Sequence, residues 1–209
     1  ATLIPDALHG ADPNEDAAAL IKEHVAKLRP LEEAANLAWW NANTTGSDEA
    51  YKKKEDTQNS IDAALADKKT FARVKALKAA ADKGEIKDAA VARQIQLLHI
   101  QYLEKQVAPD LLKRINAKAN AVEQGFNIYR AKIDGVEVPD SKVRSTLKES
   151  ADSAVRQKVW EASKGVGSAV ESDLAELVGL RNDAAKQLGF KTFHDLQLAL
   201  NEQDGAELV

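Results

Sequence analysis

The chain has 209 residues, of which 44% are hydrophobic and 30% are charged, a balance typical of a globular protein rather than a disordered one. Its 29 basic and 33 acidic residues are interspersed and give a net charge of −4. This argues against a nucleic-acid-binding protein, because such proteins usually carry a clustered basic excess. The absence of cysteine excludes disulfides and thiol chemistry, and no apolar run approaches the roughly 20 residues of a membrane-spanning helix.

The first predicted helix begins at Asp12-Pro13, where Asp serves as the N-cap and Pro takes the first helical position. Pro30 is expected to kink or divide this helix before it continues to Trp40. The polar run over residues 41–47 then predicts a turn-rich break. The apolar residues that recur at helical spacing before this break are Leu20, Ile21, Val25, Leu28 and Leu31.

The remaining helices follow from capping residues and apolar spacing. Ser47 is the expected cap of the second helix, Gly84 and Gly189 end two others, and Thr192 opens the last one as part of a capping box. The expected helices are one from 48 past 65, then 70–83, 88–107, 109–130, 141–149, 152–163, a long one ending at 188, and one from 193.

The pattern changes once along the chain. Residues 131–133 and 136–138 flank Asp134-Gly135, a two-residue sequence that strongly favours a β-hairpin. No fixed-period repeat and no Pro/Gly/Ser-rich linker divides the rest. The sequence therefore predicts a single all-α domain over residues 1–209 with one short β-hairpin near residues 131–138.

The four histidines do not form a zinc motif. None of His9, His24, His99 and His194 has a second histidine three or four residues away, the spacing that brings two rings to one metal on a helix. His99 lies among apolar residues and is expected in the core, and His194 is expected to be a capping or surface residue.

Other catalytic motifs are also missing from the sequence. There is no Gly-x-Ser-x-Gly nucleophile elbow and no phosphate-binding loop, and Gly165 and Gly167 lack the third glycine and the preceding strand of a dinucleotide loop. We therefore predict no catalytic residue, no metal ligand and no cofactor-binding residue in this chain.

Two features are candidates for ligand contact. The first is the group Trp39, Trp40, Asn41, Asn43 and Thr44, which places two indole rings beside polar amides. The alternative is that one Trp packs in the core and the Asn and Thr residues only form turns and caps.

The second candidate is Arg181, which stands within an apolar helical spacing. Arginine in such a place requires a carboxylate partner or a buried anion, unless its side chain extends to solvent from the edge of the stripe. The apolar positions of that spacing are Leu174, Leu177, Val178, Ala184, Ala185 and Leu188.

Residues 33–45, which include Trp39, Asn41 and Asn43, resemble the N-terminal lid region of the angiotensin-converting-enzyme family of zinc peptidases, where a Trp precedes an Asn-x-Asn-Thr stretch. Residues 159–161, 177–185 and 189–190 give a second match, to a Trp-rich helix followed by an Asn-x-Ala-Ala segment and a Gly-aromatic pair. Order and spacing agree across residues 15–195, and the chain also resembles bacterial relatives of this family and the oligoendopeptidase group.

The resemblance implies a helical ellipsoid with a deep cleft, in which the first helices act as a lid. It implies that Trp39, Asn41, Asn43 and Thr44 lie on the side of the lid that faces the cleft. In the complete enzyme, a zinc-bound water deprotonated by the Glu of a His-Glu-x-x-His helix attacks a peptide carbonyl near the substrate C-terminus. None of this machinery matches a position here, and neither Ser163 nor Lys164 matches the family's chloride-binding Arg.

We first expect an N-terminal lid and cleft-wall fragment of a zinc-dependent peptidyl-dipeptidase or oligopeptidase that is inactive alone, with zinc bound in the full-length enzyme and peptide substrate held together with the missing C-terminal part. The alternative is a self-contained helical module that binds a peptide or protein. A designed consensus protein is disfavoured by the irregular glycines. A coding sequence that continues past Val209 into a His-Glu-x-x-His segment favours the first interpretation, and the family favours a periplasmic or secreted location.

The fragment interpretation makes a prediction about association. The residues at 205–209 resemble the start of another helix, so we expect the chain to be truncated and to expose apolar faces meant for the missing part. Self-association should follow and can be measured by light scattering or sedimentation. A clean monomer at high concentration, or a high and sharply cooperative thermal midpoint, would count against truncation.

Overall fold

The first helix, α1 (Pro13–Thr45), begins where the sequence predicts. In the computed structural model, which describes residues 12–208, the Asp12 carboxylate accepts a hydrogen bond of 3.0 Å from the backbone N–H of Asn14. The helix continues through Pro30, so of the two expected effects of this proline, a kink or a division of the helix, the division is wrong. Gly46 ends the helix with a φ of 70°, a backbone conformation that favours glycine.

The predicted turn-rich break over residues 41–47 is also wrong, because all but its last two residues are helical. The side chains expected to form turns instead bond to the helix one turn back. Asn43 donates to the carbonyl of Trp39 over 3.0 Å, and Thr45 donates to the carbonyl of Asn41 over 2.7 Å. Ser47 caps the next helix as expected, since its hydroxyl accepts from the backbone N–H of Ala50.

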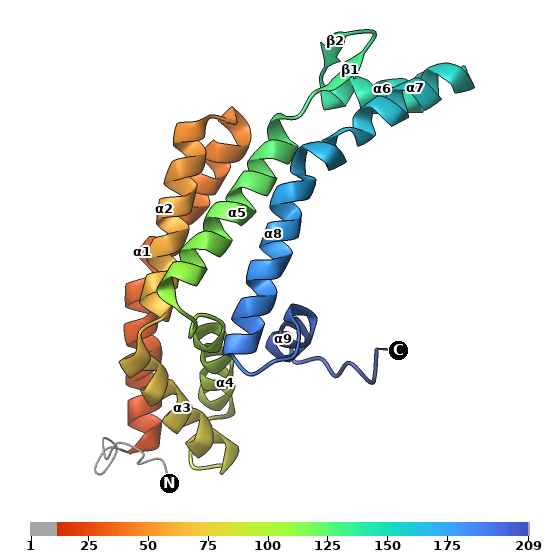
Figure 1. Cartoon of the computed structure of the whole chain (residues 1–209). Helices are drawn as coiled ribbons and strands as arrows, with labels where there is room; N and C mark the ends of the chain where they lie inside the picture. Colours follow the sequence, from red (N-terminus) through yellow and green to blue (C-terminus); the bar gives the residue numbers. More distant parts are fainter. Residues whose placement is uncertain (1–11, 209) are drawn as a thin grey trace.

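The described residues form nine helices and one two-stranded sheet (Figure 1). The all-α class with one hairpin is therefore confirmed. The long helices lie side by side, with α5 between α2 and α8 (Figure 1). After α1 come α2 (Asp48–Leu65), α3 (Lys68–Asp82), α4 (Ala89–Glu104), α5 (Pro109–Ile128), α6 (Asp140–Glu149), α7 (Ser153–Lys164), α8 (Val166–Gln187) and α9 (Phe193–Leu200).

The main hydrophobic core lies where α1 to α4 meet. Its members occupy one side of each helix, which is why apolar spacing could place them; they include Leu20, Leu28, Leu77, Ile95 and Tyr102. Val25 was expected in the same stripe but is exposed. A second core, which includes Leu111, Leu112, Leu180 and Ala184, joins α5 to α8. No helix within residues 12–208 combines the length and the apolar character needed to span a bilayer.

The hairpin of β1 (Ala131–Ile133) and β2 (Val136–Val138) has the predicted register. Asp134 and Gly135 both have positive φ, 54° and 80°, as a two-residue turn between twisted strands requires. Together with α6 and α7 the hairpin forms an arm that projects beyond the bundle (Figure 1). The arm has its own small core of Ala131, Val143 and Val159.

Gly165 connects this arm to α8. The Tyr129 hydroxyl donates to the carbonyl of Ala162 over 3.0 Å and lies against Gly165. A Cβ atom at position 165 would come within 2.3 Å of that hydroxyl, whereas one at Gly167 would meet nothing within 4 Å. Only the first of these two glycines is therefore required by close packing.

A buried charge fixes α2 against α4 and α5. The Asp62 carboxylate, only 2% exposed, lies 3.4 Å from the Lys105 ammonium group. It also accepts from the Gln58 amide at 3.0 Å and from the Asn116 amide at 2.7 Å. Both carboxylate oxygens thus have partners, as a buried charge requires.

Candidate functional site

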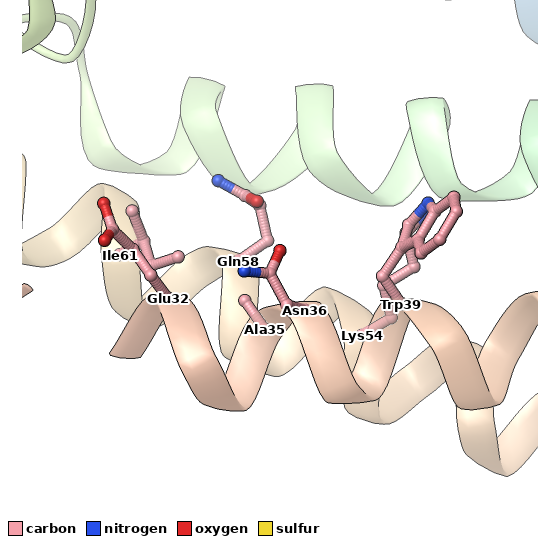
Figure 2. A pocket seen from close by; sticks show the side chains of 7 residues that line it. All are labelled: Glu32, Ala35, Asn36, Trp39, Lys54, Gln58 and Ile61. Carbon is pink, nitrogen blue, oxygen red and sulfur yellow. The ribbon is translucent and has the colours of Figure 1, made fainter. Parts of the chain in front are cut away.

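A groove of about 380 Å³ runs between α1 and α2. Figure 2 shows side chains from both helices lining it, with the Trp39 ring and the Gln58 amide pointing to the same side. The lining residues repeat at helical spacing on each helix, so each set shares one face. They are Glu32, Ala35, Asn36 and Trp39 from α1, and Lys54, Gln58 and Ile61 from α2.

The tryptophans of the candidate group both reach solvent. Trp39 is 50% exposed and Trp40 is 61% exposed, so the alternative that one of them packs in the core is wrong. Of the two, only Trp39 lines the groove. Successive helical residues point about 100° apart, which separates the two rings.

Asn43 lies behind the groove, in a polar network that joins α1, α2 and α5. Its amide nitrogen donates to Glu123 over 2.9 Å. The other carboxylate oxygen of Glu123 lies 2.5 Å from the Lys54 ammonium group, which borders the groove. Asn43 therefore acts on the groove indirectly, by holding the carboxylate that holds Lys54.

Tyr51 completes this network from the buried side. Its hydroxyl accepts from the Asn127 amide at 3.1 Å and donates to the Asn43 side-chain oxygen at 3.5 Å. The Asn120 amide donates to the Tyr51 carbonyl over 2.8 Å. Burial raises the pKa of the Tyr51 phenol above its usual value, which keeps the hydroxyl protonated and able to donate.

The other members of the candidate group lie outside the groove. Trp40, Asn41 and Thr44 are exposed. The Thr44 hydroxyl donates to the carbonyl of Trp40 over 2.8 Å, which satisfies it within the helix. Asn41 lines a separate, smaller hollow of about 250 Å³ together with residues of α2. The structure thus brings Trp39 into the groove and Asn43 into the network beside it, and leaves these three outside both.

Arg181 lies on α8, and α5 lies between α8 and α2, the helix that forms one wall of the groove (Figure 1). Its guanidinium carbon is 5.2 Å from the centre of the Phe193 ring. An aromatic face thus takes the place of the carboxylate or anion that sequence reasoning considered. Two of the apolar positions in its stripe, Leu174 and Val178, are exposed.

The described histidines lie on three different helices. His24 shares a hydrogen bond of 3.3 Å with the Tyr102 hydroxyl, His99 stacks on the Phe71 ring, and His194 is exposed at the start of α9. Burial lowers the pKa of His24 and of His99. Within residues 12–208 no group of three or more His, Cys, Asp or Glu could hold a metal ion, and His9 lies outside the described residues. The described donors therefore do not fit a zinc centre.

A comparison with protein families matches residues 11–206 to the family described as angiotensin-converting enzyme. The chain belongs to the angiotensin-converting enzyme family of peptidases. The match covers all nine helices and the hairpin, which confirms the resemblance drawn from residues 33–45 and 159–190. A comparison with curated proteins gives no match. Members of the angiotensin-converting enzyme family are in general zinc-dependent, and the family indicates a peptide as substrate.

Most of the groove escaped sequence reasoning. Glu32, Asn36, Lys54 and Gln58 were not singled out, because charged and amide residues on exposed helix faces are common. Residues 32, 35, 36 and 39 have the spacing of one helix face, but of these only Trp39 was singled out. Nothing in the sequence showed that residues 54, 58 and 61 lie opposite it.

Proposed function

We propose that this chain is the lid and one wall of the substrate cleft of a zinc-dependent peptidyl-dipeptidase or oligopeptidase. Residues 1–209 act as one N-terminal helical domain in this proposal, and the zinc site belongs to a further part of the protein. The family match and the scattered histidines support this assignment. The chain alone is then inactive.

The groove between α1 and α2 is the observation that carries the peptide-binding part of the proposal. Its Trp39 ring offers an apolar surface to a side chain, and the Asn36 and Gln58 amides can each donate to and accept from a peptide backbone. Glu32 and Lys54 add one charge of each sign. Its volume of about 380 Å³ falls at the lower end of the range of small ligand sites, which suits one or two residues of a peptide.

The network behind the groove supports a preorganised site. Lys54 is held by Glu123, which is held in turn by Asn43. A side chain fixed before binding loses less entropy when the ligand arrives. Asn43 is thus a positioning residue of the lid in this proposal.

Replacing Trp39 with alanine tests the groove. We expect peptide affinity to fall about tenfold, because a half-exposed indole at a contact surface contributes roughly 1–2 kcal/mol. Short peptides titrated by calorimetry provide the measurement. Trp160→Ala is the matched control, since Trp160 is 52% exposed but lies on α7 in the arm. An equal loss in both variants, or none in Trp39→Ala, would contradict the assignment.

An activity assay tests the catalytic part separately. The chain incubated with zinc and short peptides should give no cleavage above background. Cleavage that a chelator abolishes would show that residues 1–209 assemble a metal site of their own.

A further inference from the structure

The surface of α3 that faces solvent carries a row of lysines. Lys68, Lys75 and Lys83 are exposed, and the residues between them on the same side, Ala72 and Ala79, are small and exposed too. Separations of seven and eight residues equal about two helical turns each, so the three ammonium groups follow one line about 10–12 Å apart. This row lies at the end of the bundle opposite the hairpin (Figure 1).

The lysines of this row keep their charge available. None of the three forms an ion pair with another described residue, whereas Lys78 on the same helix pairs with Asp82 over 2.7 Å. Residues 67–88 hold seven basic and four acidic side chains in a chain whose net charge is −4. Arg73 of this segment is paired with Asp16 and Glu23 of α1, so the unpaired positive charge lies on the side of the lysine row. That side attracts acidic partners over about a Debye length.

An apolar hollow of about 250 Å³ adjoins the row. Pro13 of α1 forms one wall, and the side chains of α3 that line it are small or aliphatic. Lys83 and Glu85 stand among its lining residues and make part of it polar. The α3 members are Ala76, Leu77, Ala79 and Ala80.

We propose that the lysine row and the adjoining hollow, together the α3 surface, bind an acidic amphipathic helix of a partner protein. Carboxylates two turns apart on such a helix match the lysine spacing. The alanines between the lysines allow a second helix to approach to about 8–10 Å between axes, and one apolar side chain of the partner enters the hollow. This inference is independent of the peptide groove on α1 and α2.

An anionic membrane is the other partner that a lysine row could attract. Helices that lie on membranes insert large apolar side chains between the headgroups. Among the large apolar residues that are exposed in residues 12–208, none lies between Trp40 and Leu97. The α3 surface has small apolar groups and a hollow instead, which fit a protein helix.

The probe for this surface is a labelled synthetic helix of about 16 residues, with glutamates two turns apart and leucines beside them. Fluorescence anisotropy should show binding to the full chain that weakens as salt is added. A peptide with glutamine in place of each glutamate should bind at least about tenfold more weakly. Equal binding of both peptides would overturn the proposal.

Charge reversal on the protein gives the second measurement. The triple variant Lys68→Glu, Lys75→Glu and Lys83→Glu should lose about tenfold or more in affinity, because three attractions become repulsions. All three side chains are exposed, so circular dichroism should show an intact fold. The same affinity loss in the matched control below would overturn the proposal.

The matched control reverses three exposed lysines away from α3, Lys53, Lys142 and Lys148, and makes the same change in net charge. Its affinity for the acidic peptide should stay within about twofold of the unmodified chain, since these lysines lie beyond the contact.

A last variant tests whether the hollow contributes to binding in addition to the charge of the lysines. Ala79→Phe leaves every charge in place but fills the hollow, so affinity should fall about fivefold or more. The proposal is wrong if Ala79→Phe binds the peptide normally. It is also wrong if phosphatidylserine vesicles bind the chain more tightly than the peptide and displace it.

Discussion

Asp62→Ala is expected to destabilise the chain by about 3–5 kcal/mol, the usual cost of removing one partner from a buried ion pair. The change leaves the Lys105 ammonium group with Glu104, 3.3 Å away, as its one carboxylate partner among the described residues. It also removes the acceptor of the Gln58 amide and one of two acceptors of the Asn116 amide, which keeps Asn59. Urea unfolding followed by circular dichroism gives the free energy. Asp56→Ala, which removes an exposed carboxylate from the same helix, is the control and should change it little.

A double variant shows how much of the loss comes from the Asp62–Lys105 ion pair. Lys105→Met removes the ammonium group but keeps an apolar chain of similar length, so Asp62→Ala should cost less in its presence. We expect the two changes to be non-additive by about 1–3 kcal/mol. Simple additivity would mean that Asp62 stabilises the fold through its amide contacts alone.

Gly165→Ala is expected to destabilise the chain by about 1–3 kcal/mol, the range for an added methyl group in a filled space. The new Cβ and the Tyr129 hydroxyl cannot both keep their places at 2.3 Å, so the hydrogen bond to Ala162 is lost. Thermal unfolding measures the effect. Adding Tyr129→Phe to the variant removes the clashing oxygen and should recover part of the loss.

Gly167→Ala should instead raise the stability of the chain. Its Cβ would meet nothing within 4 Å, and alanine has the higher helix propensity within α8. We expect stabilisation of up to about 1 kcal/mol. Destabilisation by both substitutions would contradict the assignment of the close contact to Gly165 alone.

The sequence was a good guide wherever a local rule decided the structure. The N-caps Asp12 and Ser47 and the capping box of Thr192 with Asp195 lie where the pattern placed them. The Asp134-Gly135 turn is confirmed for the same reason, since positive φ at two successive residues needs this kind of dipeptide.

The sequence was a poor guide where side chains had two ways to satisfy their hydrogen bonds. Asn and Thr in residues 41–45 suit turns, yet within α1 they bond to carbonyls one turn back and the helix continues. Asn43 has a further partner in Glu123, 80 positions away in the chain, which no local pattern could reveal.

The groove between α1 and α2 could not be predicted from the sequence because it depends on how the two helices pack. Each wall could be read as one face of a helix, but the choice of facing residues depends on how α1 and α2 are rotated about their axes. That rotation is set by the core, in which Leu20 and Leu65 belong to the same cluster. The pairing of Trp39 with Gln58 is therefore a property of the packed protein.

The continuity of α1 through Pro30 bears on where this helix can bend. Proline has no N–H, so the carbonyl of Ala26 receives no helical hydrogen bond, and resistance to bending is lowest at that turn. Trp39 lies nine residues further on, about 14 Å along the axis. A bend of about 20° at Pro30 would carry the indole sideways by about 5 Å. Because Ala42 is buried and Asn43 bonds to Glu123 of α5, such a bend requires α2 and α5 to move together with the second half of α1.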